Sequence, residues 1–328
     1  MKKILILGGG FSKERAISLI TAKSVLKALK KKRYKVIICE PDGKLLEKIK
    51  SFKPDVIFNA LHGRFGEDGY IQAILEGARV KYTHSGVYAS YIAMDKDVSK
   101  KLFLKNRITT PKYIKYVFNK KNLINKKILY TVKKKLNFPA VIKPINEGSS
   151  VDVYICNEKN FLHNLKKLSI YREILIEEFI GGREIQVAIL GKKKLGAIEL
   201  VPKRKFYDYE AKYNSKAKTK HIIPVNLSKR DLNNVLNIAL KAHKLIGCRG
   251  VTRSDFKFYK GKFFLLETNT QPGMTSLSLV PEIAAFSGMS FINLIEWIIK
   301  DASINRYKKK NIFLFNIIFT IKHSNYKK

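Results

Sequence analysis

Short apolar strands alternate with a long amphipathic helix over the first sixty residues, and this alternation restricts the fold more than any other feature. Strands are expected at Ile4–Leu7, Val36–Cys39 and Val56–Ala60, with a helix from about Lys13 to Lys30 between the first two. Strands separated by helices form parallel sheets with helices on both faces. The N-terminal part of the chain is therefore expected to be a doubly wound, parallel α/β domain.

Beyond residue 94 the pattern changes to strands joined by turns. The expected strands are Phe138–Lys143, Ile174–Phe179, Glu184–Leu190 and Leu195–Val201, and a hairpin pairs Asp255–Phe258 with Phe263–Glu267 around a turn at Lys260–Gly261. One helix is expected near Asp231–Ile246. These breaks predict four units: residues 1–94, 95–180, 181–302, and a basic, apolar extension at 303–328.

The chain is strongly basic, with 65 lysines and arginines against 26 aspartates and glutamates. Only 12 of these cations are arginine, the residue that nucleic-acid readers use for phosphate and guanine edges. The lysines are spread along the whole chain beside many Ile and Asn residues, all with AT-rich codons. We therefore expect genome composition bias and no specific nucleic-acid partner, with general polyanion binding as the alternative.

Compartment signals point to the cytoplasm. The three cysteines are scattered, so a disulfide scaffold or thiolate zinc site is not expected. The apolar run at Ile4–Leu7 is shorter than a signal-peptide core, and no apolar stretch reaches the ~20 residues of a membrane span. The apolar run Asn311–Ile321 lies in the extension at 303–328, which we expect to pack on the body, with a membrane-surface anchor as the alternative.

Two glycine-rich loops follow the first and third expected strands. Gly8–Gly10 does not complete the GxGxxG dinucleotide fingerprint, because Lys13 stands at the third glycine position, but it can present backbone N–H groups to a small anion. Glu14 either complements the helix dipole or holds an ammonium group beside that anion. The loop Leu61–Gly69 contains three glycines and His62 at a strand tip, which favours a ligand-binding loop over a surface turn.

The segment Val141–Ser150, VIKPINEGSS, is the strongest local signal. A strand delivers Lys143, Pro144 ends it, and a small loop with two serines follows. Such a loop can lay backbone amides and hydroxyls over phosphates while the lysine neutralises their charge. The alternative is a strand followed by a tight turn.

Three oxygen-bearing side chains lie on the expected hairpin. Asp255 begins one arm, Glu267 ends the other, and Asn269 is two residues further on the same face. Two carboxylates and an amide oxygen suit Mg²⁺, although both carboxylates could instead pair with lysines. Arg253 and the loop Gly273–Ser276 favour a metal site, because they add a cation and an oxyanion-type loop beside it.

Seven segments in order resemble the D-alanine–D-alanine ligases, which are ATP-grasp enzymes of peptidoglycan precursor synthesis. They are GGGFSKERAIS, LHGRFGEDG, MDKDVSK, VIKPINEGSS, FYDYEAKY, RSDF and LLETNTQPGMTSLSLVPE, and the resemblance covers about residues 1–302. It implies an α/β N-terminal domain followed by a two-part ATP-grasp fold, with ATP held between the central and C-terminal domains. It also implies ligation of two D-alanines through an acylphosphate, in a homodimer.

The resemblance assigns roles to individual residues. Glu14 is expected to hold the ammonium of the first D-alanine, His62 to lie beside its carboxylate, and Ser278 to hold the carboxylate of the second. Glu14, Ser149 and Tyr213 close the site, while Arg253 and the amide of Gly273 stabilise the oxyanion. ATP is expected to contact Lys96, Lys143, Glu147, Ser149, Ser150, Glu177, Phe179, Ile180, Glu184 and Lys212. Asp255, Glu267 and Asn269 bind two Mg²⁺, with Mn²⁺ as an alternative and Glu267 bridging.

Some positions depart from the family pattern. Leu277 replaces a common histidine, and Lys257 and Phe258 stand where smaller apolar residues are usual. The resemblance names no base for the second D-alanine. The polar segment Lys203–Lys220 is expected to be a mobile lid. Rival functions are another ATP-grasp carboxylate–amine ligase, a polyanion-binding protein and, weakened by the broken glycine fingerprint, a nicotinamide oxidoreductase.

Overall fold

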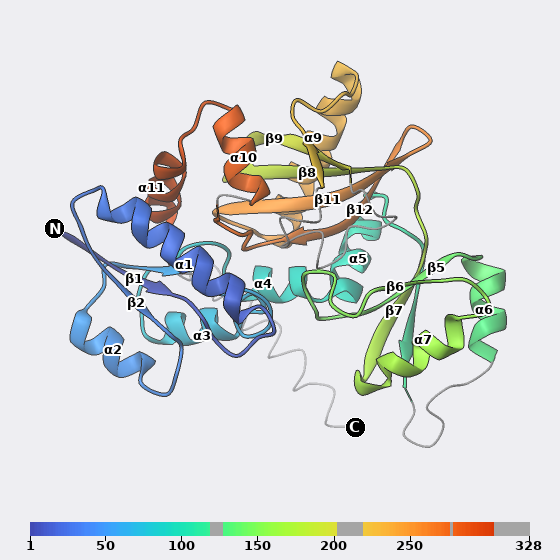
Figure 1. Cartoon of the computed structure of the whole chain (residues 1–328), viewed down its shortest axis with the longest axis horizontal. Coiled ribbons are helices and arrows are strands. Elements are labelled where there is room, and N and C mark those ends of the chain that lie inside the picture. The colour runs from blue at the N-terminus through green and yellow to red at the C-terminus, as the bar shows by residue number, and fades with distance from the viewer. Residues whose placement is uncertain (119–126, 202–218, 276–277, 305–328) are drawn as a thin grey trace, which may run out of the picture.

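The computed structural model describes residues 1–118, 127–201, 219–275 and 278–304. Within these residues the strands form three separate sheets, and the fold is a mixed α/β one. Figure 1 shows the first sheet at the left, the second at the right and the third above them, so that the edges of all three meet near the centre of the molecule.

The first sheet is the parallel one that the N-terminal pattern predicts. Its order is β2-β1-β3, and both pairings are parallel. The strands are β1 (Lys2–Leu7), β2 (Tyr34–Cys39) and β3 (Val56–Asn59), connected and followed by α1 (Arg15–Lys30), α2 (Leu45–Phe52) and α3 (Tyr70–Gly77). Because the strands are parallel, the loops after β1 and β3 leave the sheet at the same edge. Gly8–Gly10 and Leu61–Gly69 are those loops.

The second sheet is antiparallel, with the order β4-β7-β5-β6. Helices α4 (Val87–Met94) and α5 (Lys96–Lys105) lead into it, and Asp95 caps α5 by accepting hydrogen bonds from two backbone N–H groups. The sheet and its helices share one apolar core. Its elements are β4 (Tyr113–Val117), α6 (Lys127–Lys135), β5 (Ala140–Pro144), β6 (Tyr154–Cys156), α7 (Phe161–Lys167), a 3₁₀ turn (Leu168–Ile170) and β7 (Glu173–Glu178).

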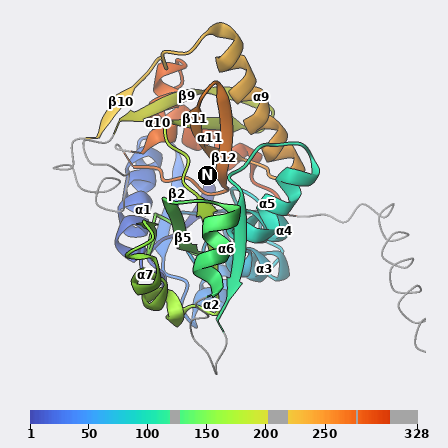
Figure 2. The same ribbon diagram turned by 90° about the vertical axis from the view of Figure 1, so that its right-hand side faces the viewer.

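The third sheet is antiparallel, with the order β10-β9-β8-β11-β12. Helix α9 (Lys229–Ile246) covers one face, and α10 (Leu279–Phe286) and α11 (Phe291–Asp301) pack toward the other, as Figure 2 shows for α9 and α10. Successive side chains of each strand point to opposite faces of the sheet, so each strand contributes to the packing on both sides. The strands are β8 (Arg183–Leu190), β9 (Lys193–Val201), β10 (Lys220–Ile222), β11 (Val251–Tyr259) and β12 (Lys262–Asn269).

One continuous core joins the first and third sheets. Ile4 and Phe58 of the first sheet belong to the same buried cluster as Ala188 of β8, Ile283 of α10 and Leu294 of α11. Burial of this much apolar surface holds the first and third sheets in a fixed relation. The domain limits at residues 94, 180 and 302 stay predictions, and the residues beyond 304 lie outside the described part of the chain.

In the described ranges no single helix is long and apolar enough to cross a membrane. Helices α10 and α11 satisfy the length and composition only as a pair bent by 108°. Much of their surface is buried: the buried set includes Leu279, Val280, Ile283, Leu294, Ile295 and Ile298.

Candidate functional site

Two cavities lie side by side where the sheets meet, and three residues line both of them. The shared residues are Lys96, Glu147 and Glu267. The first cavity, which we name the amino-acid cavity after the ligand that the family resemblance implies, is lined by Glu14, His62, Ser149, Arg253, Asn269, Gly273 and Ser278, among others. The second, which we name the nucleotide cavity for the same reason, is lined by Lys143, Ser150, Glu177, Phe179, Ile180, Glu184 and Asp255, among others.

All the described residues to which the resemblance assigns a role thus line one cavity or both. Gly8–Gly10, proposed from the sequence as an anion-binding loop, line neither. Lys212 and Tyr213 fall outside the described residues, as do Leu277 and nearly all of the lid expected at 203–220. The roles that the resemblance gives to the residues of both cavities remain predictions.

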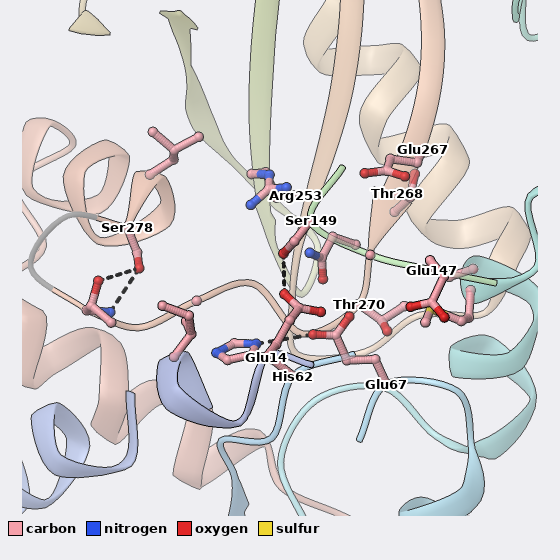
Figure 3. Close-up of a pocket in the computed structure, with 18 of the residues that line it drawn as sticks. Glu14, His62, Glu67, Glu147, Ser149, Arg253, Glu267, Thr268, Thr270 and Ser278 are labelled. Atoms are coloured by element: carbon pink, nitrogen blue, oxygen red, sulfur yellow. Dashed lines mark hydrogen bonds and ion pairs between the residues drawn. The ribbon is translucent and has the colours of Figure 1, made fainter. Parts of the chain in front are cut away.

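Glu14 is the point where the first and second sheets meet in the amino-acid cavity. It is buried just before α1 begins, and the Ser149 hydroxyl donates a hydrogen bond to its carboxylate (Figure 3). Ser149 has a φ of +50°, an uncommon conformation for a residue other than glycine. A Cβ on Gly148 would stand 3.1 Å from Glu14 Oε2, so the backbone of this loop approaches the carboxylate closely.

His62 is held at both ring nitrogens. Nε2 lies 2.9 Å from the Thr21 hydroxyl, and Nδ1 lies 3.1 Å from Glu67 Oε1. Burial raises the pKa of Glu67 above its ordinary value, which His62 offsets in part. Sequence reasoning assigned no role to Thr21 or Glu67. Thr21 carries a readable signal, since it lies seven residues, or two helical turns, after Glu14 and so faces the same side.

A buried amide link joins the loops of the first and third sheets. Asn59, at the end of β3, donates from Nδ2 to Gln271 Oε1 at 2.6 Å, and Gln271 Nε2 donates to the carbonyl of Leu61. The Gln271 backbone N–H donates to Asn269 Oδ1 at 2.9 Å. Gln271 therefore connects the strand that carries Asn269 with the loop that carries His62, and sequence reasoning missed it.

One face of the third sheet carries alternating charges toward the cavities. The register pairs Asp255 with Glu267 and Arg253 with Asn269. Arg253 makes a bidentate ion pair with Asp255, at 2.8 Å from Nε and 3.0 Å from Nη2, and Lys96 Nζ lies 3.5 Å from Glu267. The oxygen donors on this face suit a divalent cation. In this structure the side chains of Arg253 and Lys96 neutralise the two carboxylates. Among the described residues no group of three or more His, Cys, Asp and Glu is placed to hold a metal.

Glu177 lies between two lysines in the nucleotide cavity. Its carboxylate is 2.8 Å from Lys143 Nζ and 3.0 Å from Lys100 Nζ. Burial opposes ionisation of Glu177, but the two lysines outweigh it and hold its pKa below the ordinary value. Burial lowers the pKa of Lys100 to about 8. Sequence reasoning missed Lys100, although it follows Lys96 by four residues and so shares its helix face.

The loops before α10 and after β5 complete the walls. Ser278, next to α10, accepts a hydrogen bond from the Thr275 backbone N–H at 2.9 Å (Figure 3). A Cβ on Gly273 would stand 2.9 Å from Ser278 Oγ, so a residue larger than glycine would require the Ser278 side chain or the loop to shift. Lys96 Nζ donates to the carbonyl of Glu147 at 2.6 Å, which ties α5 to the loop after β5.

Known proteins match nearly the whole chain. The D-alanine–D-alanine ligase of Pelagibacter ubique (strain HTCC1062) is 70% identical over 305 residues, covering 93% of this chain and 99% of that protein. The D-alanine–D-alanine ligase of Zymomonas mobilis is 42% identical over 311 residues, covering 92% and 94%. The structure of D-alanine–D-alanine ligase from Bacillus anthracis complexed with ATP superposes with a TM-score of 0.79 at 29% identity, covering 92% and 97%.

The family model described as the D-ala D-ala ligase C-terminus matches residues 102–300. This range takes in the second sheet, the third sheet and the loops that line the nucleotide cavity. The sequence identity extends the relationship through the first sheet as well. The chain belongs to the D-alanine–D-alanine ligase family.

Proposed function

We propose that this chain joins two D-alanines into D-alanyl-D-alanine at the expense of ATP, for peptidoglycan synthesis, and that the two cavities hold the two kinds of substrate. The observation that carries the proposal is the shared wall of Lys96, Glu147 and Glu267. A nucleotide in the second cavity can place its terminal phosphate beside these shared residues, facing an amino acid in the first cavity. Direct phosphoryl transfer to a carboxylate requires the two groups to lie next to each other, and neighbouring cavities allow this.

The first D-alanine is proposed to bind between Glu14 and His62. The carboxylate of Glu14 attracts the substrate ammonium, and the ring of His62 faces its carboxylate. Thr21 and Glu67 hold that ring in one orientation. Ser278 is proposed to receive the carboxylate of the second D-alanine, because it lies in the same cavity on the loop from the third sheet.

ATP is proposed to lie between the second and third sheets, as in an ATP-grasp fold. Phe179 and Ile180 give the cavity an apolar wall for the base, beside Glu177. Lys96 and Lys143 offset the phosphate charge, and Glu147, Ser149 and Ser150 form the loop over the phosphates. Glu184 is assigned to the ribose. The family resemblance adds Lys212 and Tyr213, which are proposals on sequence alone.

Asp255, Glu267 and Asn269 are the residues proposed to hold Mg²⁺. Their carboxylate and amide oxygens match the preference of this ion, and the two carboxylates face each other across the hairpin. When bound, Mg²⁺ supplies neutralisation of the charge on the transferring phosphoryl group. Arg253 already offsets the charge of Asp255 from the same strand, and Lys96 that of Glu267.

The chemistry proceeds in two steps. The terminal phosphoryl group of ATP passes to a carboxylate oxygen of the first D-alanine, which yields ADP and an acylphosphate. The amino group of the second D-alanine, after losing a proton, attacks the acyl carbon, and the C–O bond to phosphate then breaks to leave the peptide bond. Arg253 and the backbone amide of Gly273 are placed to stabilise the oxyanion of the tetrahedral intermediate. We also propose that the protein is located in the cytoplasm and forms a homodimer.

A coupled assay tests the function directly. Phosphate release from ATP and Mg²⁺ should require D-alanine, should fail with L-alanine, and should match D-alanyl-D-alanine formation measured by mass spectrometry. Glu267→Gln should reduce turnover to near background, whereas Glu158→Gln, at an exposed surface pair with Lys133, should not. Equal turnover with L-alanine would refute the substrate assignment. Activity of Glu267→Gln at the wild-type level would refute the metal site.

A further inference from the structure

A lysine that no role has yet claimed lies inside the nucleotide cavity. Lys257, on β11, and Glu184, on β8, both line it. The two strands run side by side in the third sheet (Figure 1), and the register places Lys257 directly opposite Glu184. Residues directly opposite in an antiparallel pair have Cβ atoms close enough for their side chains to interact.

Lys257 and Glu184 form an ion pair that is largely shielded from solvent. Lys257 Nζ donates to Glu184 Oε2 at 2.9 Å, and the exposed side-chain fractions are 18% for the lysine and 11% for the glutamate. Gln186 Nε2 lies 3.4 Å from the other oxygen, Oε1. The carboxylate is therefore held at both ends by donors from two strands. An ionised carboxylate accepts at about four lone-pair sites, so it retains acceptor capacity toward the cavity.

We infer that Lys257 is a positioning residue for nucleotide recognition: it fixes the carboxylate of Glu184 in the orientation that accepts a ribose hydroxyl. This inference rests on the proposed function, in which Glu184 meets the ribose. Without the lysine, one end of the carboxylate is released, and the side chain can rotate away from the hydroxyl. The lysine thereby determines how strongly the enzyme distinguishes a ribonucleotide from a deoxyribonucleotide.

The alternative is that Lys257 only adds positive charge for the phosphates. The two alternatives predict different substrate dependence. A general electrostatic contribution changes binding of every adenine nucleotide triphosphate by the same factor. A positioning role changes the preference for ATP over an analogue that lacks the hydroxyl, and it leaves the analogue itself nearly unaffected. A ratio of specificity constants therefore decides, whatever the variant does to overall affinity.

The experiment measures kcat/KM for ATP, 2′-deoxy-ATP and 3′-deoxy-ATP at saturating D-alanine. A hydrogen bond to a charged group contributes roughly 10- to 100-fold in binding, so the wild type should prefer ATP over one deoxy analogue by about that factor. Glu184→Ala should lose this preference. Lys257→Met should reduce it to within about threefold, and Lys257→Arg should restore most of it, since a cation again reaches the carboxylate. Lys262→Met is the matched control, because Lys262 is an exposed lysine of the same hairpin outside the cavity lining.

Each outcome separates the inference from the function on which it rests. Equal loss toward ATP and both analogues in Lys257→Met, or an unchanged preference, would overturn the positioning role. If Glu184→Ala keeps the wild-type preference, the ribose assignment fails and the inference fails with it, while D-alanine-dependent phosphate release still stands. Thermal unfolding of each variant identifies a folding defect, which would lower all three specificity constants without changing their ratio.

Discussion

Replacing Glu177 by glutamine should destabilise the folded protein, because it removes the carboxylate that pairs with two lysines at the nucleotide cavity. Glu177 is fully buried and is the carboxylate that both Lys100 and Lys143 approach, at 3.0 and 2.8 Å. The substitution keeps the size of the side chain and removes its charge. Two lysines then face each other in a closed site with a neutral amide between them. Removing one partner of a buried ion pair costs about 3–5 kcal/mol, so we expect a loss of stability of that order near neutral pH.

The loss should depend on pH because Lys100 can respond by giving up its proton. Burial lowers the pKa of Lys100 to about 8 in the wild type, below the ~10.4 of an unfolded chain. Its neutral form is thus favoured by folding, and stability from this group rises with pH once the folded pKa is passed. Loss of the Glu177 charge should move that folded pKa lower still. Relative to the wild type, the variant should therefore regain about 1.4 kcal/mol per unit of this further shift as the pH rises toward 8. Above pH 8 both proteins gain stability in parallel, so the difference between them should not change further.

Urea unfolding of the wild type and Glu177→Gln at pH 6, 7, 8 and 9 measures both quantities. Glu178→Gln is the control, because this neighbour is only half-buried and accepts a hydrogen bond from the Lys112 backbone N–H. Its unfolding free energy should differ little from that of the wild type and show no comparable change with pH. A Glu177→Gln variant as stable as the wild type, or a cost that is the same at pH 6 and pH 8, would contradict the reasoning.

Three further substitutions test other parts of the site and fold. Gln271→Leu leaves buried polar groups such as the Asn59 amide short of a partner, at about 1–3 kcal/mol for each, and should raise the KM for D-alanine more than that for ATP in steady-state assays. Burial raises the pKa of Glu67, so folding favours its neutral form and the wild type loses stability as the pH rises through that pKa. Glu67→Gln lacks this loss, so the difference between its melting temperature and that of the wild type should shift in favour of the variant from pH 4 to pH 7. Ser228→Ala removes the N-cap of α9 and should lower stability by about 1 kcal/mol in thermal unfolding, with ligase activity unchanged.

Local patterns predicted the elements of the fold better than their assembly. The strands β1 and β3 are short buried runs ended by polar or glycine-rich loops, and such signals are contained within a few residues. The common core of Ile4, Phe58, Ile283 and Leu294 joins segments more than two hundred residues apart, and no local period indicates it. Helices α10 and α11 drew no prediction. Apolar residues cover most of α10 and leave little amphipathic period to detect. Helix α11 does have such a period, since Leu294, Ile295, Ile298 and Ile299 form its buried face, and sequence reasoning missed it.

The site was predictable where one element carries several of its residues. Asp255, Glu267 and Asn269 lie on one hairpin, and the structure places them on one face. Lys100, Thr21 and Gln271 were missed, because each acts through a partner from a distant segment. Helical spacing from Lys96 and Glu14 was the one local signal for Lys100 and Thr21, whereas a glutamine within a loop has none.

Even the hairpin prediction was correct for an incomplete reason. Regular pairing outward from the turn at Lys260–Gly261 would place Asp255 opposite Leu266 and direct Glu267 to the opposite face. The structure has an irregularity between Asp255 and Phe256, where Leu266 is the extra residue of a β-bulge and Glu267 becomes the partner of Asp255. Leu266 itself lines the nucleotide cavity. One unpaired residue thus brings the two carboxylates together, and a sequence period of two cannot reveal it, because a bulge is the point at which that period fails.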